Sequence, residues 1–354
     1  EDALRVVSEG DRGDEYNFDP VPGAVRVERP DRVRVSLGAA SEGEVSAVIA
    51  AKYRVPAELT PDREARSGSS SVLSVTLRIR LVSGLDRVDV ESRVDNTARD
   101  HRLRLHLRAP FTARRFEVES AFETAERPID PPRDAFGSES PSEFPVGATP
   151  QRSFATLDDG QRALTVANRG LAEVDAVPEA DGTTCLAVTL LRAVGWLSRG
   201  DLRLRPGDAG PGLATPGAQV AGQHRAELSI RLHPVDSVER VSEAHRFANP
   251  ARAWIGGGPV DAPLADGVRL LEIDDPAVVV SAIEPRADRR PVLRLYNASD
   301  QPRTVSLRWN GPGARAIESV DLMERRTQDD AVSTEETRAT LSLRPWAIAT
   351  LRIC

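Results

Sequence analysis

The regular alternation of apolar and polar residues limits the fold of this chain more than any other feature. In residues 73–81, LSVTLRIRL, every second side chain is apolar, and serine, threonine or arginine fill the positions between them. Residues 101–111, HRLRLHLRAPF, and 226–234, AELSIRLHP, repeat the pattern. Successive side chains of a strand point to opposite faces, so these segments predict strands with one face on a core and the other toward water. Strands of this kind are typical of antiparallel sheets, and the predicted fold class is all-β.

The order of the segments predicts two domains. A helix signal stands at residues 236–247, DSVERVSEAHRF, where Asp236 and Glu239 have the spacing of a capping box. A stretch rich in glycine, proline and alanine follows, and strand patterns then resume. We therefore expect a large β domain over residues 1–250, a linker over 251–267 and a small β-sandwich over 268–354. The first of these is much larger than an ordinary sandwich of about 100 residues.

Composition excludes some classes of function. The net charge of −7 argues against a nucleic-acid partner, because phosphate binding requires a basic surface. We also expect no membrane partner, since no apolar run reaches the roughly 20 residues that a membrane span requires. The two cysteines, Cys185 and Cys354, lie far apart in the sequence, which favours a reducing compartment, and we expect a cytoplasmic protein. The chain starts at Glu1 and its one methionine is Met323, so we expect an excised piece of a longer protein.

No self-contained catalytic set is present in the sequence. None of the five histidines lies in an HExxH motif, and there is no CxxC pair, G-x-S-x-G elbow or phosphate-binding loop. We therefore assign no catalytic residue and no metal ligand to this chain.

Two polar stretches have the residue types that recognise sugars. Residues 13–18 read GDEYNF, and residues 190–219 place Trp196 before a run of arginine and aspartate. Carboxylates accept hydrogen bonds from sugar hydroxyls, and guanidinium groups donate to them. The alternative is structural: Tyr16 closes a turn, and the arginine pairs with the nearby aspartate. In the second stretch the candidate sugar-binding residues are Arg199, Asp201 and Arg203, whereas GDEYNF could bind a sugar, bind a metal or close a turn.

The order of several segments resembles the C-terminal half of the family 38 glycoside hydrolases, the α-mannosidases, in their bacterial branch. The resembling segments are GDRGDEYNFDP at 10–20, VESRVDNTARDHRLRL at 90–105, residues 144–174, residues 186–222 and, further on, PVLRLYNASDQPRTVSL and ESVDLMERR. Of these, residues 186–222 carry the most specific part of the resemblance. The likeness runs over nearly the whole chain and keeps its order.

The resemblance implies a large antiparallel supersandwich, similar to that of galactose mutarotases, followed by a small β-sandwich. It also implies that the nucleophile and the ligands of a zinc-type divalent ion belong to an N-terminal catalytic domain that precedes this chain. The chain would then form one wall of an α-mannoside site, with that catalytic domain as its partner. The resemblance makes Tyr16 a candidate substrate-binding residue that would reach the sugar, with Asp14 and Asn17 as neighbours that shape its loop. Arg199, or Arg203 second, would point to the cleft with Asp201 orienting it.

Other interpretations stay open at this point. A stand-alone carbohydrate-binding module would use Trp196 or Trp254. An aldose-epimerase-like enzyme on the same fold would need an acid and a base, for which only His106 and His224 are available. Self-association into a homo-oligomer is compatible with each of these. If the catalytic domain is missing, we expect an exposed apolar surface near Tyr16 and residues 196–219.

Overall fold

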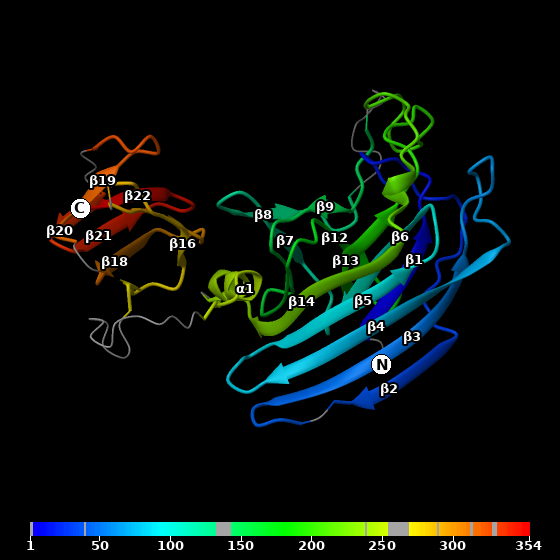
Figure 1. The fold of residues 1–354 in the computed structure, drawn as a ribbon, viewed down its shortest axis with the longest axis horizontal. Helices are drawn as coiled ribbons and strands as arrows, with labels where there is room; N and C mark the ends of the chain where they lie inside the picture. Colours follow the sequence, from blue (N-terminus) through cyan, green and yellow to red (C-terminus); the bar gives the residue numbers. More distant parts are fainter. Residues whose placement is uncertain are drawn as a thin grey trace. The chain divides into compact units, whose positions relative to one another are not determined.

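The fold is described by a computed structural model that covers residues 3–38, 40–131, 143–237, 239–253, 269–288, 290–311, 314–327 and 331–354. The chain forms two compact units. The large unit consists of Glu1–Val118 and Glu126–Val235, and the small unit consists of Glu119–Ala125 and Asp236–Cys354. Almost all of the predicted linker, residues 251–267, lies outside the described residues, so its bounds stay a prediction. The all-β prediction is confirmed (Figure 1).

The large unit is built on a nine-stranded sheet with the order β2-β3-β4-β5-β14-β11-β10-β7-β8. It is antiparallel from β2 through β7. Its strands are β2 (Arg32–Leu37), β3 (Glu44–Pro56), β4 (Ser70–Val82), β5 (Val88–Asn96), β14 (Gly222–Pro234), β11 (Arg162–Asn168), β10 (Phe154–Asp158), β7 (Arg115–Glu119) and β8 (Thr124–Arg127).

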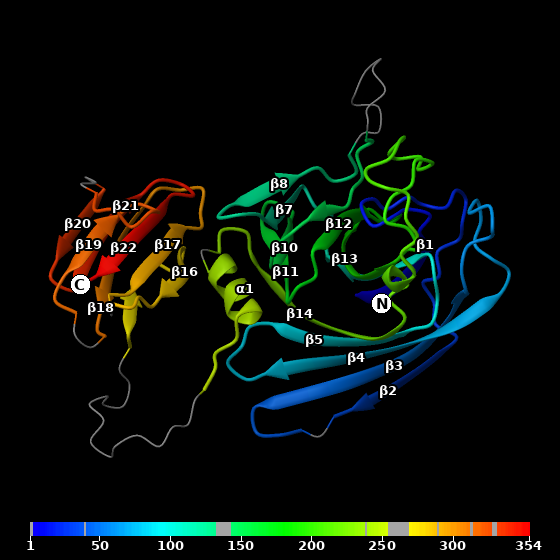
Figure 2. The same cartoon turned by 45° about the horizontal axis from the view of Figure 1, so that its top comes forward.

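A second, five-stranded sheet has the order β1-β6-β13-β12-β9 and is also antiparallel. Its strands are β1 (Leu4–Gly10), β6 (His101–Arg108), β13 (Thr184–Ala193), β12 (Glu173–Pro178) and β9 (Thr149–Pro150). Figures 1 and 2 show the nine-stranded sheet curving around this smaller sheet. The two sheets together form the large sandwich that the sequence predicts.

The core of the large unit follows the period-2 pattern. Leu103, Leu105 and Leu107 of β6 are at most 1% exposed. Phe154 and Leu157 of β10 are fully buried as well. Burial of one such side chain contributes roughly 1.5–3 kcal/mol, so these rows are a principal source of the unit's stability.

The polar row of β6 differs from the sequence prediction, because it does not face water. Arg102 and Arg104 are each 3% exposed and His106 is 1% exposed. Arg102 lies within 2.7 Å of Glu9 and 3.0 Å of Glu173, and it also lies under the ring of Phe18. Carboxylates of neighbouring strands therefore neutralise the arginines, and this pairing is what permits a charged face to be buried.

One apolar face of the large unit is left exposed. Leu37 of β2 is 86% exposed, and Val45 of β3 and Leu81 of β4 are 53% and 49% exposed. The strand register places Leu37 opposite Ala47 and Val45 opposite Leu81, so these side chains form one run across β2, β3 and β4. A separate apolar surface is predicted near Tyr16 and residues 196–219. In that region Tyr16 is 54% exposed and Leu213 is 56% exposed.

The small unit is a β-sandwich of two four-stranded sheets. One has the order β15-β18-β21-β20 and the other β16-β17-β22-β19. Their strands are β15 (Leu271–Ile273), β18 (Arg303–Trp309), β21 (Arg338–Leu343), β20 (Val332–Glu335), β16 (Val278–Glu284), β17 (Val292–Asn297), β22 (Ile348–Ile353) and β19 (Ile317–Val320). Leu293, Leu295, Leu307 and Leu341 pack in its core.

The predicted helix is present as α1 (Arg240–Ala248), and it buries Val241, Ala244 and Phe247. Its N-cap is Glu239, which makes no side-chain cap hydrogen bond, so the predicted capping box does not form. A short 3-10 helix, η1 (Pro216–Gln219), precedes β14. Nowhere in the described part of the chain is a helix long and apolar enough to cross a membrane.

Candidate functional site

Two loops of the large unit meet and bring the predicted site residues together. We call them the aspartate loop, residues 11–20, and the arginine loop, residues 194–215. The aspartate loop closes on itself where Asp11 bridges Pro20, and the arginine loop closes where Trp196 bridges Ala214. The amide of Glu15 donates to the carbonyl of Trp196 at 3.0 Å and joins the two loops. Stretches that are some 180 positions apart in the sequence thus form one loop cluster.

Asp14 is the residue that locks this cluster. Its carboxylate is fully buried. Oδ1 accepts from the amides of Tyr16 at 3.0 Å and Asn17 at 2.9 Å, which fixes the turn after Asp14. Oδ2 accepts from the amide of Arg199 at 2.8 Å and from the guanidinium of Arg205. Asp14 therefore acts as the buried anchor of the loops and does not itself face solvent.

Tyr16 is held on the surface by this anchor. Its side chain is 54% exposed, and the Arg205 guanidinium carbon lies 6.0 Å from the centre of its ring. Asn17 donates from its side chain to Glu143. A Cβ atom added at Gly210 would lie 3.0 Å from the Tyr16 hydroxyl, so a glycine at this position leaves room for the phenol. Tyr16 is therefore a partly exposed residue of the loop cluster, with its phenol beside Gly210.

Arg199 and Asp201 form a two-bond ion pair at the surface. Arg199 donates to the two carboxylate oxygens of Asp201 at 2.8 and 2.6 Å. Its guanidinium carbon also lies 4.8 Å from the centre of the Trp196 ring. The hydrogen bond from Arg199 lowers the pKa of Asp201, so the carboxylate stays ionised. The pairing expected as the structural alternative is thus present, with Asp201 about half exposed and Arg199 about one quarter exposed.

Arg203 is oriented differently from Arg199. Its guanidinium pairs with Glu64 at 3.1 Å and is about half exposed. Its amide donates to Asp19, a buried carboxylate that also pairs with Arg12 at 3.2 Å. Arg203 therefore lies on the side of the cluster that carries Glu64 and contributes mainly to holding the loops together.

Sequence reasoning missed the buried charges that support the site. Asp11 pairs with Arg192 at 2.8 Å, and Asp19 and Arg205 were likewise not selected. Burial raises the pKa of Asp11 in spite of this arginine. The available signal was the recurrence of aspartate at positions 11, 14 and 19 within one short loop, together with Arg12 in that loop and the arginines of the second stretch. Each buried aspartate of the loop has its own arginine.

A serine–histidine–asparagine arrangement lies nearby but is closed to substrate. Ser8 Oγ and His101 Nδ1 are 3.3 Å apart, and His101 Nε2 is 2.9 Å from Asn96 Oδ1. All three residues are at most 1% exposed. Asn96 in turn donates to the carbonyls of Gln219 and Val220. The network ties the segment that follows the arginine loop to β5 and β6, and the burial of Ser8 closes it to substrate.

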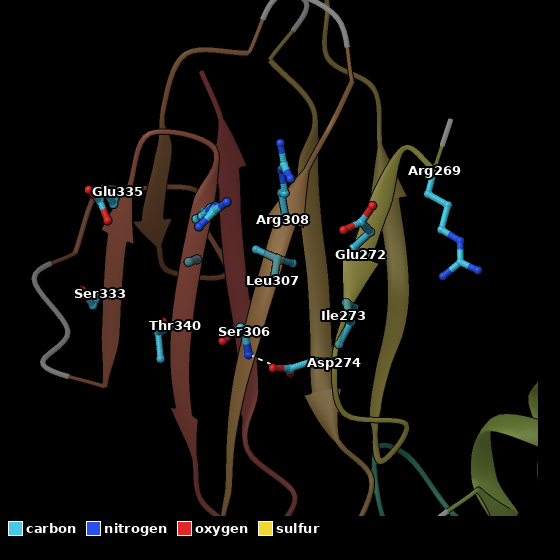
Figure 3. Close-up of a pocket in the computed structure, with 12 residues that line it drawn as sticks. Arg269, Glu272, Ile273, Asp274, Ser306, Leu307, Arg308, Ser333, Glu335 and Thr340 are labelled. Atoms are coloured by element: carbon cyan, nitrogen blue, oxygen red, sulfur yellow. Dashed lines mark hydrogen bonds between the residues drawn. The ribbon is translucent and has the colours of Figure 1, made fainter. Parts of the chain in front are cut away.

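A concave region lies on the small unit, on the open face of the β15-β18-β21-β20 sheet (Figure 3). It encloses about 620 Å³. Glu272, Arg308, Arg338 and Glu335 stand side by side across the four strands. Aliphatic and polar side chains complete the described lining, with no aromatic ring to stack on a sugar. We therefore place the candidate site in the loop cluster of the large unit.

Comparison with known proteins agrees with this architecture. The description "Glycosyl hydrolases family 38 C-terminal domain" matches residues 6–201. The chain belongs to glycoside hydrolase family 38. The "Glycosyl hydrolases family 38 C-terminal beta sandwich domain" matches residues 277–351, within the small unit. The two family 38 regions thus follow one another in the order that the resemblance implies.

Family 38 relatives are considerably longer than this chain. A curated protein of Halalkalibacterium halodurans, named "Putative mannosylglycerate hydrolase", is 27% identical over 295 residues, which are 82% of this chain and 30% of that protein. An α-mannosidase structure from Enterococcus faecalis V583 has a TM-score of 0.79 at 22% identity, covering 99% of this chain and 38% of that one. Another family 38 structure from Enterococcus faecalis has a TM-score of 0.80 at 21% identity and covers 99% and 40%.

Proposed function

We propose that this chain is the non-catalytic β region of a family 38 α-mannosidase and that its loop cluster forms one wall of the mannoside-binding site. A catalytic domain encoded ahead of it would supply the nucleophile. The proposal also places the protein in the cytoplasm, since Cys185 and Cys354 are both free thiols.

The observation that carries the proposal is the shared anchor Asp14. One buried carboxylate fixes the backbone of Tyr16 and that of Arg199, although these residues are far apart in the sequence. Binding sites depend on side chains that are held in place by supporting contacts before the ligand arrives. Tyr16 and the Arg199–Asp201 pair are therefore presented as a preorganised group.

The chemistry of this group suits a polyhydroxylated ligand. The Tyr16 phenol can donate or accept a hydrogen bond, Arg199 donates, and Asp201 accepts. A sugar that displaces water from the ion pair would find both types of partner within one patch. Arg199 covers a face of Trp196, so the polar groups, and not that ring, are assigned the contacts to the sugar.

The zinc-type ion that the family resemblance implies has no fitting ligand set in the loop cluster. Asp11, Asp14 and Asp19 are each paired with an arginine, and a divalent cation would have to displace that charge. The proposal therefore assigns this ion to the catalytic domain and derives no step through it.

The first experiment assays this 354-residue chain with an aryl α-mannoside. We expect no hydrolysis, because the loop cluster offers neither a free nucleophilic carboxylate nor a metal site. Turnover by the purified chain that is lost in a Tyr16→Phe variant would contradict the proposal.

The second experiment uses the longer gene product that the proposal requires. Tyr16→Phe and Arg199→Ala should each lower kcat/KM about 10-fold or more, because a hydrogen bond to the sugar is lost. Tyr53→Phe and Arg225→Ala are matched controls, since Tyr53 is buried in β3 and Arg225 is a surface residue of β14. Equal effects of site and control variants would contradict the assignment.

A stand-alone carbohydrate-binding module is the main competing function. It requires an open aromatic platform, whereas Arg199 lies over Trp196, and Trp254 lies outside the described residues. Calorimetry of the chain with mannose or mannobiose separates the two, since only the module predicts binding heat.

The aldose-epimerase alternative is weaker, because His106 is buried in the five-stranded sheet and His224 of β14 bonds the Val220 carbonyl at 2.6 Å.

A further inference from the structure

A second cluster of chemically active side chains lies on the outer face of the five-stranded sheet. His106 is on β6, Cys185 on β13, and Glu179 directly follows β12. These three strands are neighbours in the sheet, with Ala187 opposite His106 and Val177 opposite Cys185. An imidazole nitrogen, the Cys185 sulfur and a Glu179 oxygen all lie within 4.8 Å of one another.

His106 is the unusual member of this cluster. It is 1% exposed, and among the described residues neither of its ring nitrogens has a hydrogen-bond partner. A neutral imidazole carries one donor and one acceptor, and buried polar groups of this kind are nearly always satisfied. The structure thus buries both ring nitrogens of His106 without a hydrogen-bond partner among the described residues, which is the arrangement expected of a metal ligand.

We propose that His106, Cys185 and Glu179 bind a zinc ion that cross-links β6, β13 and the end of β12. Thiolate, imidazole and carboxylate are the three side-chain ligands that zinc accepts, at bond lengths of about 2.0–2.3 Å. The three side chains move toward the ion, so that each ligand atom reaches its bond length. As the Zn–S bond forms, the Cys185 thiol releases its proton to solvent, and a water fills the fourth position.

Glu179 provides the route by which the ion enters. Its side chain is 20% exposed, whereas His106 and Cys185 are almost completely buried. The Arg5 guanidinium holds one of its oxygens at 2.5 Å. Partners of this kind orient a metal-ligating carboxylate and leave the other oxygen for the ion.

The charges around the cluster are compatible with a divalent cation. Arg5 lies opposite His106 in the β1–β6 register and is shared between Glu179 and Glu28, at 2.5 and 3.5 Å. Arg104, the next polar residue on β6, is paired with Glu9 and Asp175. Zinc with one thiolate and one carboxylate sums to zero charge, so the loaded site places no net positive charge beside these arginines.

Cobalt substitution tests the site directly. The 354-residue chain is stripped with a chelator and titrated with Co²⁺, then with Zn²⁺. We expect roughly one equivalent to bind, with the thiolate-to-cobalt charge-transfer band and the visible bands of a tetrahedral ion, both removed by Zn²⁺. Cys185→Ser should abolish the charge-transfer band and weaken zinc binding by about 100-fold or more.

The matched control is Cys354→Ser, which removes the other free thiol, in the small unit. It should retain the full spectrum of the unaltered chain. Glu179→Gln, a substitution at a partly exposed position, guards against misfolding and should weaken binding while leaving the thiolate band. A cobalt spectrum without a charge-transfer band, or identical zinc affinity in the unaltered chain and Cys185→Ser, would overturn the proposal.

Discussion

Asp14 shows how one residue determines the shape of the candidate site. Its two oxygens accept from three backbone amides and from Arg205, and the side chain is fully buried. A buried ion pair contributes little net stability as long as it is intact, but removal of one member leaves the other charge without compensation. The effect of a substitution at Asp14 should therefore be much larger than its position in a surface loop suggests.

We expect Asp14→Asn to lower the free energy of unfolding by about 3 kcal/mol or more, because Arg205 stays buried without a carboxylate. Urea denaturation measures this difference. Asp201→Asn is the matched control: the Asp201 side chain is about half exposed, so the loss should stay within about 1 kcal/mol. A similar small loss in both variants would show that Asp14 is not the anchor.

His101 should make the large unit sensitive to acid. Burial lowers its pKa to about 3, and the charge of Arg66 adds to this effect. Above a pH of about 6.5 the ring is neutral in both the folded and the unfolded chain, so it contributes nothing. As the pH falls further, the unfolded chain binds a proton that the folded chain rejects, and about 2 kcal/mol of stability should be lost by about pH 5. The ring resonances of His101 should show no titration over this range, and a midpoint near pH 6.5 would contradict the prediction.

At this scale, residue types were easier to predict than the roles of individual residues. The sequence selects Asp14, Tyr16 and Arg199, and the structure brings them to one cluster. It does not distinguish the buried anchor from the exposed tyrosine, because burial depends on contacts with distant loops. Arg205 was missed for the same reason, since its partner Asp14 is 191 positions away.

The aspartate loop is the element in which backbone space matters most. A Cβ atom added at Gly13 would lie 2.0 Å from the carbonyl oxygen of Asn17 and 2.7 Å from Asp11 Oδ1. Both contacts belong to a turn that the buried carboxylates hold in place, so the loop cannot widen without breaking them. The glycine in the GDEYNF stretch is thus required by packing.

Gly13→Ala should destabilise the large unit by about 2 kcal/mol or more through this overlap. Gly217→Ala in η1 is the control, because nothing lies within 4 Å of its added Cβ atom. It should change the free energy of unfolding by no more than about 0.5 kcal/mol. Thermal or urea unfolding of both variants provides the comparison, and a destabilised Gly217→Ala with an unaffected Gly13→Ala would contradict the loop geometry.

The elements themselves followed well from the sequence, because alternation over β4, β6 and β14 directly reflects strand geometry. The residues that cover each face of these strands could not be predicted from the sequence. The alternation predicts that Arg102 and Arg104 of β6 face solvent. In the structure both are buried, and Glu9 from β1 and Asp175 from β12 pair with them. Sheet order determines those partners, and alternation within one strand contains no information about it.

For the molecule as a whole, the exposed apolar run over β2, β3 and β4 should govern behaviour in solution. β2 is an edge strand, and all of its residues are exposed. Edge strands of this kind template association unless charge blocks them. Leu37→Lys should reduce self-association of the purified chain, as measured by sedimentation velocity at several concentrations.

Ser36→Lys adds the same charge on the opposite face of the same strand and serves as the control. It should leave the sedimentation profile close to that of the unaltered chain. Equal effects of the two substitutions would indicate that net charge, and not the apolar face, controls association.

The discontinuous small unit limits how this protein can be divided. The chain passes between the units three times, and the short excursion Glu119–Ala125 returns to the large unit after contributing to the small one. Within the small unit, the ring of Phe122 meets that of Tyr296 edge-on at 5.4 Å between centroids. Cleavage after Val235 would leave Glu119–Ala125 on the N-terminal fragment, and Tyr296 on the C-terminal fragment would lose its aromatic neighbour Phe122. Any attempt to transplant the small sandwich into another protein must therefore carry a seven-residue insert from elsewhere in the gene.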